Sequence, residues 1–209
     1  IKWIIKMFLD GDLGPMTEEQ ANLLRKAYES NEKAISIVSE LLLVNKTEDV
    51  TEKEYEMQEI NLIELIENAI FNFSGEAFAR GIEVIFLKPQ EVLPKVSGDK
   101  EKISVVMQNL LENAIKYSNM HGKVFITLKH DEENVTFSIK DIGVVISEEG
   151  KSKIFEKFYR DPDAQKKEAI GSGIGLFTIK KIIERHKGKI WFESTKENGT
   201  TFYFTIPIA

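Results

Sequence analysis

Apolar residues at the beginning of the chain recur at the spacing of an α-helix. The residues on this face are Ile1, Ile4, Ile5, Phe8 and Leu9. The pattern stops at residues 10–15, which are rich in aspartate and glycine and end in proline, so they predict a turn. Thr17 and Gln20 then stand at the spacing of a capping box, and we predict that a second helix begins there.

The second helix carries a heptad seam. From residue 21 onward, the seam follows alternating steps of three and four through Leu24, Tyr28, Asn31, Ile35, Val38, Leu42 and Asn45. Two helices joined by a short turn enclose too little apolar surface to be stable alone. We therefore expect a helical hairpin that pairs with a second copy of the chain as a four-helix bundle, so the protein would be a homodimer.

A polar segment over residues 45–54 predicts a hinge, after which strands alternate with helices. Strands are predicted at 55–60, 82–87, 123–130, 134–141, 189–194 and 200–207. Helices are predicted at 62–79 after Asn61, at about 99–118 after Asp99, and at 174–186, with an irregular stretch from 141 to about 171. The predicted fold class is α+β: a helical hairpin is followed by an α/β sandwich, in which three helices cover one face of a mixed sheet.

Composition excludes several classes of function. Lys and Arg total 28 against 34 Asp and Glu, and the net charge of −6 argues against a nucleic-acid binder, which needs a basic face for phosphates. The chain has no cysteine, which excludes disulfides and thiolate metal sites. No apolar run approaches the roughly 18 residues of a membrane span, so we expect no membrane contact by this chain. Because it opens at Ile1, already at helical spacing, we interpret it as a piece of a longer protein.

Two asparagines share one stripe of the helix predicted at 99–118. Asn109, Asn113 and either Lys116 or Tyr117 follow at spacings of three or four residues, while Glu112 lies one position off the stripe. Asparagine is unfavourable inside a helix, so this pair suggests a polar edge that faces a ligand. Taken alone, however, the pair is explained more simply as a solvated helix edge.

Two other segments have residues suited to ligand binding. The strand at 134–141 ends in Asp141-Ile-Gly143, where a buried carboxylate can select an exocyclic amine, although such a sequence is most often a plain turn. The run Gly171–Leu176 alternates glycines and opens into a helix, so its backbone amides can attract phosphate. Its spacing matches neither the G-x-x-x-x-G-K-[ST] loop nor G-x-G-x-x-G.

In chain order, four segments resemble the N, G1, F and G2 boxes of sensor histidine kinases. They are the Asn-bearing helix, the Asp141-x-Gly143 strand end, the segment Ile-Phe-Glu-Lys-Phe-Tyr-Arg at 154–160, and the glycine loop. The resemblance implies that residues 51–209 are the catalytic ATP-binding domain, with a lid over about 147–170. It also implies that residues 1–50 are part of the dimerisation and histidine-phosphotransfer hairpin.

The resemblance further implies a site for ATP and Mg²⁺. Asn113 would ligate the metal through its amide oxygen, which suits a hard cation. Asn109, Lys116 and Arg160 would act on the phosphates as the catalytic residues. Asp141 would accept a hydrogen bond from the adenine amino group. The other implied nucleotide contacts are Tyr117, Gly143, Ile146, Gly171, Ser172, Gly173, Gly175 and Leu176. Phe155 and Phe158 are expected to pack the lid against the core instead.

The chain departs from the family pattern at two positions. Asn109 stands where hydrolytic relatives have glutamate, and because an amide cannot take a proton from water, this favours a kinase over an ATPase. Val145 stands where the family usually has a second glycine, and valine disfavours positive φ. A catalytically degenerate dimeric scaffold is therefore one alternative, and a stand-alone ATPase or serine kinase is another.

The resemblance also implies partners. The phosphoryl group would pass from an acceptor histidine to an aspartate of a response-regulator receiver domain, and the chain would be cytoplasmic. None of His121, His130 and His186 lies in the family's acceptor motif. We expect that motif upstream of Ile1, so that the chain as given would not phosphorylate itself.

Overall fold

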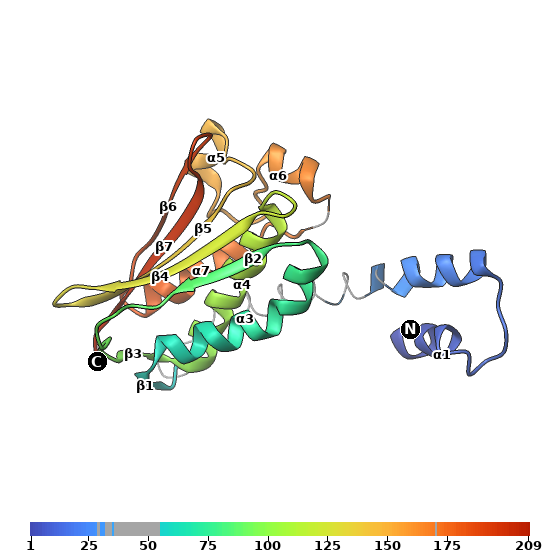
Figure 1. Ribbon diagram of the computed structural model, residues 1–209, viewed down its shortest axis with the longest axis horizontal. Helices are drawn as coiled ribbons and strands as arrows, with labels where there is room; N and C mark the ends of the chain where they lie inside the picture. The colour runs from blue at the N-terminus through green and yellow to red at the C-terminus, as the bar shows by residue number, and fades with distance from the viewer. Residues whose placement is uncertain (29, 32–34, 36–54, 170) are drawn as a thin grey trace. The chain divides into compact units, whose positions relative to one another are not determined.

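The computed structural model describes residues 1–28, 30, 31, 35, 55–169 and 171–209 (Figure 1). The chain divides into two compact units, Ile1–Asn45 and Lys46–Ala209. Within the described ranges, every helix is too short or too polar to cross a lipid bilayer.

The first unit contains the beginning of the helical hairpin. Helix α1 spans Lys2–Leu9, and residues 18–28 are helical. The capping box is confirmed, because the Thr17 amide donates to the Gln20 side chain at 2.9 Å and the Gln20 amide donates to Thr17 Oγ1 at 3.2 Å. Part of the heptad seam, namely Val38, Leu42 and Asn45, lies outside the described residues.

Three helices form one layer of the second unit. They are α3 (Leu62–Ala79), α4 (Lys100–Tyr117) and α7 (Gly175–Arg185), each within about a residue of its predicted range. The predicted caps are present, because the Asn61 side chain accepts from the Ile63 amide and the Asp99 side chain accepts from the Lys102 amide. Helix α4 packs against both α3 and α7.

A five-stranded sheet forms the other layer, in the order β2-β4-β5-β7-β6. The strands are β2 (Glu83–Leu87), β4 (Lys123–His130), β5 (Asn134–Asp141), β6 (Ile190–Thr195) and β7 (Gly199–Pro207). Strand β2 pairs parallel to β4 and all other neighbours are antiparallel, so the predicted mixed sheet is confirmed. Figure 1 shows the three helices on one face of this sheet.

A second, two-stranded sheet was not predicted. Strand β1 (Met57–Ile60) pairs with β3 (Val96–Asp99) and not with the main sheet. Strand β3 has only four residues, two of them Ser and Gly, and therefore lacks an apolar alternation that could reveal it. The first predicted strand also begins two residues late, at Met57.

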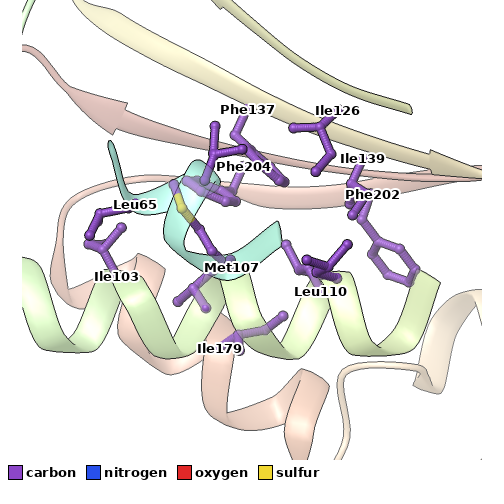
Figure 2. Packing of buried hydrophobic residues seen from close by; sticks show 14 of the residues in the cluster. Leu65, Ile103, Met107, Leu110, Ile126, Phe137, Ile139, Ile179, Phe202 and Phe204 are labelled. Atoms are coloured by element: carbon purple, nitrogen blue, oxygen red, sulfur yellow. The ribbon is translucent and has the colours of Figure 1, made fainter. Parts of the chain in front are cut away.

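The core lies between the helical layer and the sheet. Buried and half-buried positions alternate along β5 and β7, so that every second side chain enters the core. Figure 2 shows Met107 and Leu110 of α4 below Phe137 and Ile139 of β5. This packing fixes α4 against the sheet, so the polar edge of α4 has a defined position relative to the end of β5.

The stretch predicted to be irregular contains two short helices. They are α5 (Glu148–Lys153) and α6 (Pro162–Lys167), each of six residues. Side-chain caps start them, because Ser147 accepts from the Gly150 amide and Asp161 accepts from the Asp163 amide. Asp161, which is 2 % exposed, also accepts from the Ser147 hydroxyl at 2.6 Å and so ties the two helices together. The expectation of an irregular stretch was wrong here, because helices this short show no apolar periodicity.

Candidate functional site

The polar edge of α4 is formed by two hydrogen-bonded amides. Asn113 Nδ2 donates to Asn109 Oδ1 at 3.1 Å, across one helical turn, and both residues are half-buried. The remaining amide oxygen, Asn113 Oδ1, accepts no hydrogen bond from any residue of the described part of the chain. One amide oxygen on this edge is therefore available to a ligand.

Lys116 lies one turn further along the same edge. It pairs with Glu112, which the sequence spacing had placed one position off this edge. The two charged groups are 2.5 Å apart. Burial disfavours the ammonium, but the hydrogen bond and the charge of Glu112 together outweigh it, so the pKa of Lys116 is raised. Lys116 is therefore a cation at every physiological pH, and its partner holds it beside the amide pair.

Asp141, at the end of β5, is 4 % exposed, and its Oδ1 has no hydrogen-bond partner among the described residues. Burial raises the pKa of this carboxyl from 3.8 to about 7, against the opposing charge of Lys167. A buried acceptor without a donor is unfavourable unless something else satisfies it. Asp141 therefore has the environment of a ligand-binding group.

Gly143 brings the end of β5 against the end of α4. Ser118 and Gly143 form an isolated β-bridge, and the Val144 amide donates to the Tyr117 carbonyl at 3.0 Å. A Cβ at Gly143 would lie 1.8 Å from that carbonyl oxygen, which no side chain could tolerate. Glycine is required here for this close approach, and it places Asp141 and Tyr117 at neighbouring ends of their elements.

The glycine loop reaches the other end of the amide pair. Helix α7 begins at Gly175, and a Cβ there would lie 2.6 Å from Asn109 Nδ2, so the start of the helix lies directly against the amide side chain of Asn109. Within the loop, Ser172 Oγ accepts from the Ile174 amide at 3.1 Å and the Gly173 carbonyl accepts from the Phe158 amide at 3.0 Å. Gly171 borders the Arg160 guanidinium, and Leu176 packs against the core.

Two other expected nucleotide contacts, Arg160 and Ile146, have partners within the protein. Arg160 donates to the carbonyls of Ala169 and Glu168, so its guanidinium is bound within the segment 160–169. Ile146 is 8 % exposed and belongs to the core cluster, with its amide donating to Ser194 Oγ at 3.0 Å.

The two phenylalanines of segment 154–160 behave differently from one another. Phe155 packs on Phe192 and Phe202, with ring centroids 6.0 and 6.5 Å away, as expected. Phe158 does not pack on the core, and that expectation was wrong. The backbone at Phe158 has a φ of 65°, and the Phe158 amide donates to the Gly173 carbonyl. In this conformation the Phe158 ring is 64 % exposed.

Val145 does not have the strained backbone that its replacement of glycine suggested. Of the described non-glycine residues, positive φ occurs at His121, Phe158 and Lys187, and Val145 is not among them. The valine is half-buried with an ordinary backbone, so it needs no left-handed conformation at this position.

Sequence reasoning missed the contacts that α6 makes with the site. Lys167 Nζ donates to the carbonyls of Tyr117 at 2.8 Å and Ser118 at 2.6 Å, and Glu168 pairs with Arg80 at 3.3 Å. These residues lie far apart in the sequence and follow no local pattern, so only the fold reveals that they meet.

Comparison with known proteins identifies the family. Residues 98–209 match the family described as histidine kinase-, DNA gyrase B-, and HSP90-like ATPase. The adaptive-response sensory kinase SasA of Rippkaea orientalis is 32% identical over 197 residues, which are 92% of this chain and 49% of that protein. The chain spans about half or less of the length of the curated relatives first matched, the shares being 49%, 16% and 45%.

Solved structures of histidine kinases are also similar. The catalytic domain of the histidine kinase ThkA is 35% identical with a TM-score of 0.64, over 73% of this chain and 98% of that domain. The structure of ThkA in complex with the response regulator protein TrrA is 30% identical with a TM-score of 0.71, over 100% of this chain and 59% of that one.

Proposed function

Because the chain belongs to the family of histidine kinase-, DNA gyrase B- and HSP90-like ATPases, and its relatives are sensor histidine kinases, we propose that it is the catalytic core of such a kinase. Residues 51–209 would be the catalytic ATP-binding domain, with the lid at about 147–170. Residues 1–50 would be part of the dimerisation and histidine-phosphotransfer hairpin. The site would bind ATP with Mg²⁺ and deliver the γ-phosphate to a histidine.

The observation that carries this proposal is the unsatisfied carboxyl of Asp141. Its Oδ1 is buried without a partner at the end of a strand that packs into the core. The adenine amino group is a neutral hydrogen-bond donor, which this acceptor can bind without the introduction of a second charge. Tyr117 and Gly143 adjoin Asp141 through the Ser118–Gly143 bridge, and they would border the base.

The amide edge of α4 fits the phosphate end of the same ligand. Asn113 Oδ1 is a neutral oxygen without a donor, of the kind that Mg²⁺ accepts, and the metal would neutralise phosphate charge there. Lys116 supplies a cation one turn away, and Asn109 adjoins the start of α7. The loop residues Gly171, Ser172, Gly173, Gly175 and Leu176 would offer backbone amides to the phosphates. Arg160 and Ile146 would contact the nucleotide only after they leave their present partners.

Asn109 favours transfer of the phosphoryl group over its hydrolysis. The amide of Asn109 bonds Asn113 and has no basic group to activate water. The γ-phosphate would then remain intact until a histidine attacks it. His186 is 2 % exposed with both ring nitrogens hydrogen-bonded, His121 lies in the turn between α4 and β4, and His130 is the last residue of β4. We propose that none of the three is the acceptor.

The proposed partners follow from this function. The heptad seam of the first unit would pair two copies of the chain, and a response-regulator receiver domain would take the phosphoryl group from the acceptor histidine. The histidine kinase ThkA is described in complex with a response regulator, which supports this second step. An ATP-dependent reaction needs a compartment that contains ATP, and we therefore place the chain in the cytoplasm.

Calorimetry with a non-hydrolysable ATP analogue tests the proposal. The unmodified chain should bind the analogue, and Mg²⁺ should strengthen the binding. Asp141→Asn and Asn113→Ala should each weaken it by about tenfold or more, since the first replaces a charged hydrogen-bond acceptor by a weaker neutral one and the second removes a metal ligand. Asp163→Asn, which alters an exposed acid of α6, is the matched control and should bind normally. Failure of the unmodified chain to bind at millimolar analogue would contradict the proposal.

Two alternatives are separated by further measurements. A degenerate scaffold predicts that Val145→Gly increases nucleotide affinity, whereas the ordinary backbone of Val145 leads us to expect no gain. A stand-alone ATPase predicts steady release of phosphate from ATP, whereas the Asn109 amide leads us to expect almost none. Asn109→Glu would place a carboxylate there and should raise the hydrolysis rate.

A further inference from the structure

Tyr55 lies in a cluster with residues from the first turn of α4 and the last turn of α7. Its ring packs edge-on against the His186 ring, with the centroids 5.2 Å apart. The Arg185 guanidinium lies 5.6 Å from the centroid of the Tyr55 ring, and the Lys102 ammonium lies 6.0 Å from it. Two cations from two different helices therefore flank one tyrosine ring.

Two polar groups of this cluster are buried and have no hydrogen-bond partner. They are the hydroxyl Tyr55 Oη and the guanidinium nitrogen Arg185 Nη1, and neither is bonded to any residue of the described part of the chain. Arg185 and Lys102 are half-buried, and neither forms an ion pair with a described residue, although the chain carries a net charge of −6. Buried donors without an acceptor are unfavourable, above all when they are charged.

The acceptors nearest in the fold are already occupied. The carboxylate of Asp99 accepts from the Glu56 amide at 3.1 Å and from the Lys102 amide at 3.0 Å. His186 Nε2 accepts from the Asp99 amide at 2.9 Å, and His186 Nδ1 donates to the Ile182 carbonyl at 2.7 Å. The acceptor that Tyr55 and Arg185 lack is therefore one that a ligand can supply.

This cluster is separate from the candidate site described above. Lys102 is in the first turn of α4, whereas Asn113 is in its last part, about 16 Å further along the helix. Arg185 ends α7, whereas Gly175 begins it next to Asn109. A ligand of this cluster would lie at the opposite ends of both helices from the amide edge, so the inference does not depend on the proposed function.

We propose that Tyr55, Arg185 and Lys102 form a binding site for a phosphate group, supplied as the free ion or as a small phosphate ester. A phosphate has acceptor oxygens in several directions, so the phenol and the guanidinium can donate to different oxygens while the ammonium balances the charge. A carboxylate has two oxygens in one plane, which suits one guanidinium better than donors from three segments. Bound phosphate would join residue 55 to the ends of α4 and α7.

NMR titration with inorganic phosphate tests the site, with sodium chloride used to keep the ionic strength constant. The amide of Tyr55 and the guanidinium of Arg185 should shift and saturate. Tyr55→Phe keeps the ring and removes only the hydroxyl, and it should weaken binding by about tenfold. Arg185→Gln should weaken it by about tenfold or more. Tyr203→Phe is the matched control, because the Tyr203 hydroxyl already donates to Glu193 at 3.0 Å, and it should bind phosphate normally.

A second pair of variants tests the charge. Lys102→Met should weaken phosphate binding, by a smaller factor than Arg185→Gln, because it removes a charge but neither of the buried donors. Lys100→Met is its matched control, because Lys100 pairs with Glu64 at 3.0 Å, and it should bind as the unmodified chain does. Equal effects of the two lysine variants would remove Lys102 from the site and overturn the assignment.

The ligand series separates the remaining outcomes. Absence of a saturating shift at tens of millimolar phosphate would mean that water satisfies both donors, and would overturn the proposal. Unchanged binding in Tyr55→Phe with loss in Asn113→Ala would place the phosphate at the amide edge and would also overturn it. Acetate that binds as tightly as phosphate would refute the choice of phosphate. Tighter binding of glycerol phosphate than of inorganic phosphate would support an ester as the ligand, and the reverse order would support the free ion.

Urea unfolding gives an independent measurement. Phosphate should raise the unfolding midpoint of the unmodified chain and of Tyr203→Phe above its value in chloride, and this increase should be smaller in Tyr55→Phe. Without phosphate, Tyr55→Phe should be at least as stable as the unmodified chain, because it loses a hydroxyl that has no partner. A clear loss of stability in that condition would show that the hydroxyl is bonded within the fold, and would overturn the proposal.

Discussion

Replacement of Asp141 by asparagine should stabilise the second unit of the chain at neutral and alkaline pH. The carboxyl is 4 % exposed, and burial raises its pKa from 3.8 to about 7. The folded state therefore binds this proton more tightly than the unfolded state does. Stability from this group is complete below the unfolded pKa of 3.8 and is lost as the pH rises through about 7. At about 1.4 kcal/mol for each pH unit between the two values, the charged carboxylate costs up to about 4 kcal/mol above pH 7.

The assay is urea unfolding of the unmodified chain and of Asp141→Asn between pH 4 and pH 8. Trp191 reports on the sheet, and a Trp3→Phe background removes the other tryptophan from the signal. The variant should gain stability relative to the unmodified chain as the pH rises, by about 2–4 kcal/mol at pH 8. Asp163→Asn, in an exposed ion pair, should show almost no such gain. A constant difference between Asp141→Asn and the unmodified chain across this range would refute the argument that burial makes the charge costly.

Three further predictions concern single residues of the same unit. Gly143→Ala should destabilise this unit by about 3 kcal/mol or more, measured by urea unfolding, because a Cβ would lie 1.8 Å from the Tyr117 carbonyl oxygen. Gly75→Ala is the matched control, because a Cβ there would have no heavy atom within 4 Å, and it should instead stabilise helix α3 by about 0.5–1 kcal/mol. Asn113→Asp should retain Mg²⁺-dependent nucleotide binding better than Asn113→Ala in calorimetry, since it keeps an oxygen ligand, and equal loss in both variants would argue against metal ligation. His186 is buried, its ring accepts from the Asp99 amide at 2.9 Å, and burial lowers its pKa. The neutral ring therefore stabilises the folded state above the unfolded pKa of 6.5, and this stabilisation is lost as the pH falls below 6.5. In His186→Gln, the urea midpoint should depend less on pH between 5 and 6.5.

The sequence allowed the long elements to be predicted because their signals are local. Asn61 and Asp99 cap α3 and α4 as expected, and the hairpin of β4 and β5 has the predicted bounds. Strand β3 was missed because its pairing with β1 joins residues that are 36 to 42 positions apart in the sequence, and its own composition does not indicate a strand. Helices α5 and α6 were missed because their stability comes from caps and from the Asp161–Ser147 contact, which periodicity does not report.

Within the candidate site, the residue types could be predicted but not their partners. The spacing of Asn109 and Asn113 placed both amides on one stripe, and they bond one another in the structure. The pairing of Lys116 with Glu112 depends on the rotamer of Glu112, a residue that helical spacing did not place on the same edge as the asparagines. The contacts of Lys167 depend on where α6 packs, so no pattern within the sequence of α6 could indicate them.

The residues that violate local rules are the ones that the proposed function needs. A buried acceptor without a donor at Asp141 and asparagines inside a helix both oppose folding, and the packed core of α4 and β5 must compensate for them. If adenine satisfies Asp141, then nucleotide removes a penalty that exists only when the carboxyl is charged. Nucleotide should therefore raise the unfolding midpoint more at pH 8 than at pH 5, in the unmodified chain but not in Asp141→Asn. An equal increase at both pH values would mean that adenine binds without the carboxylate, and the role assigned to Asp141 would fail.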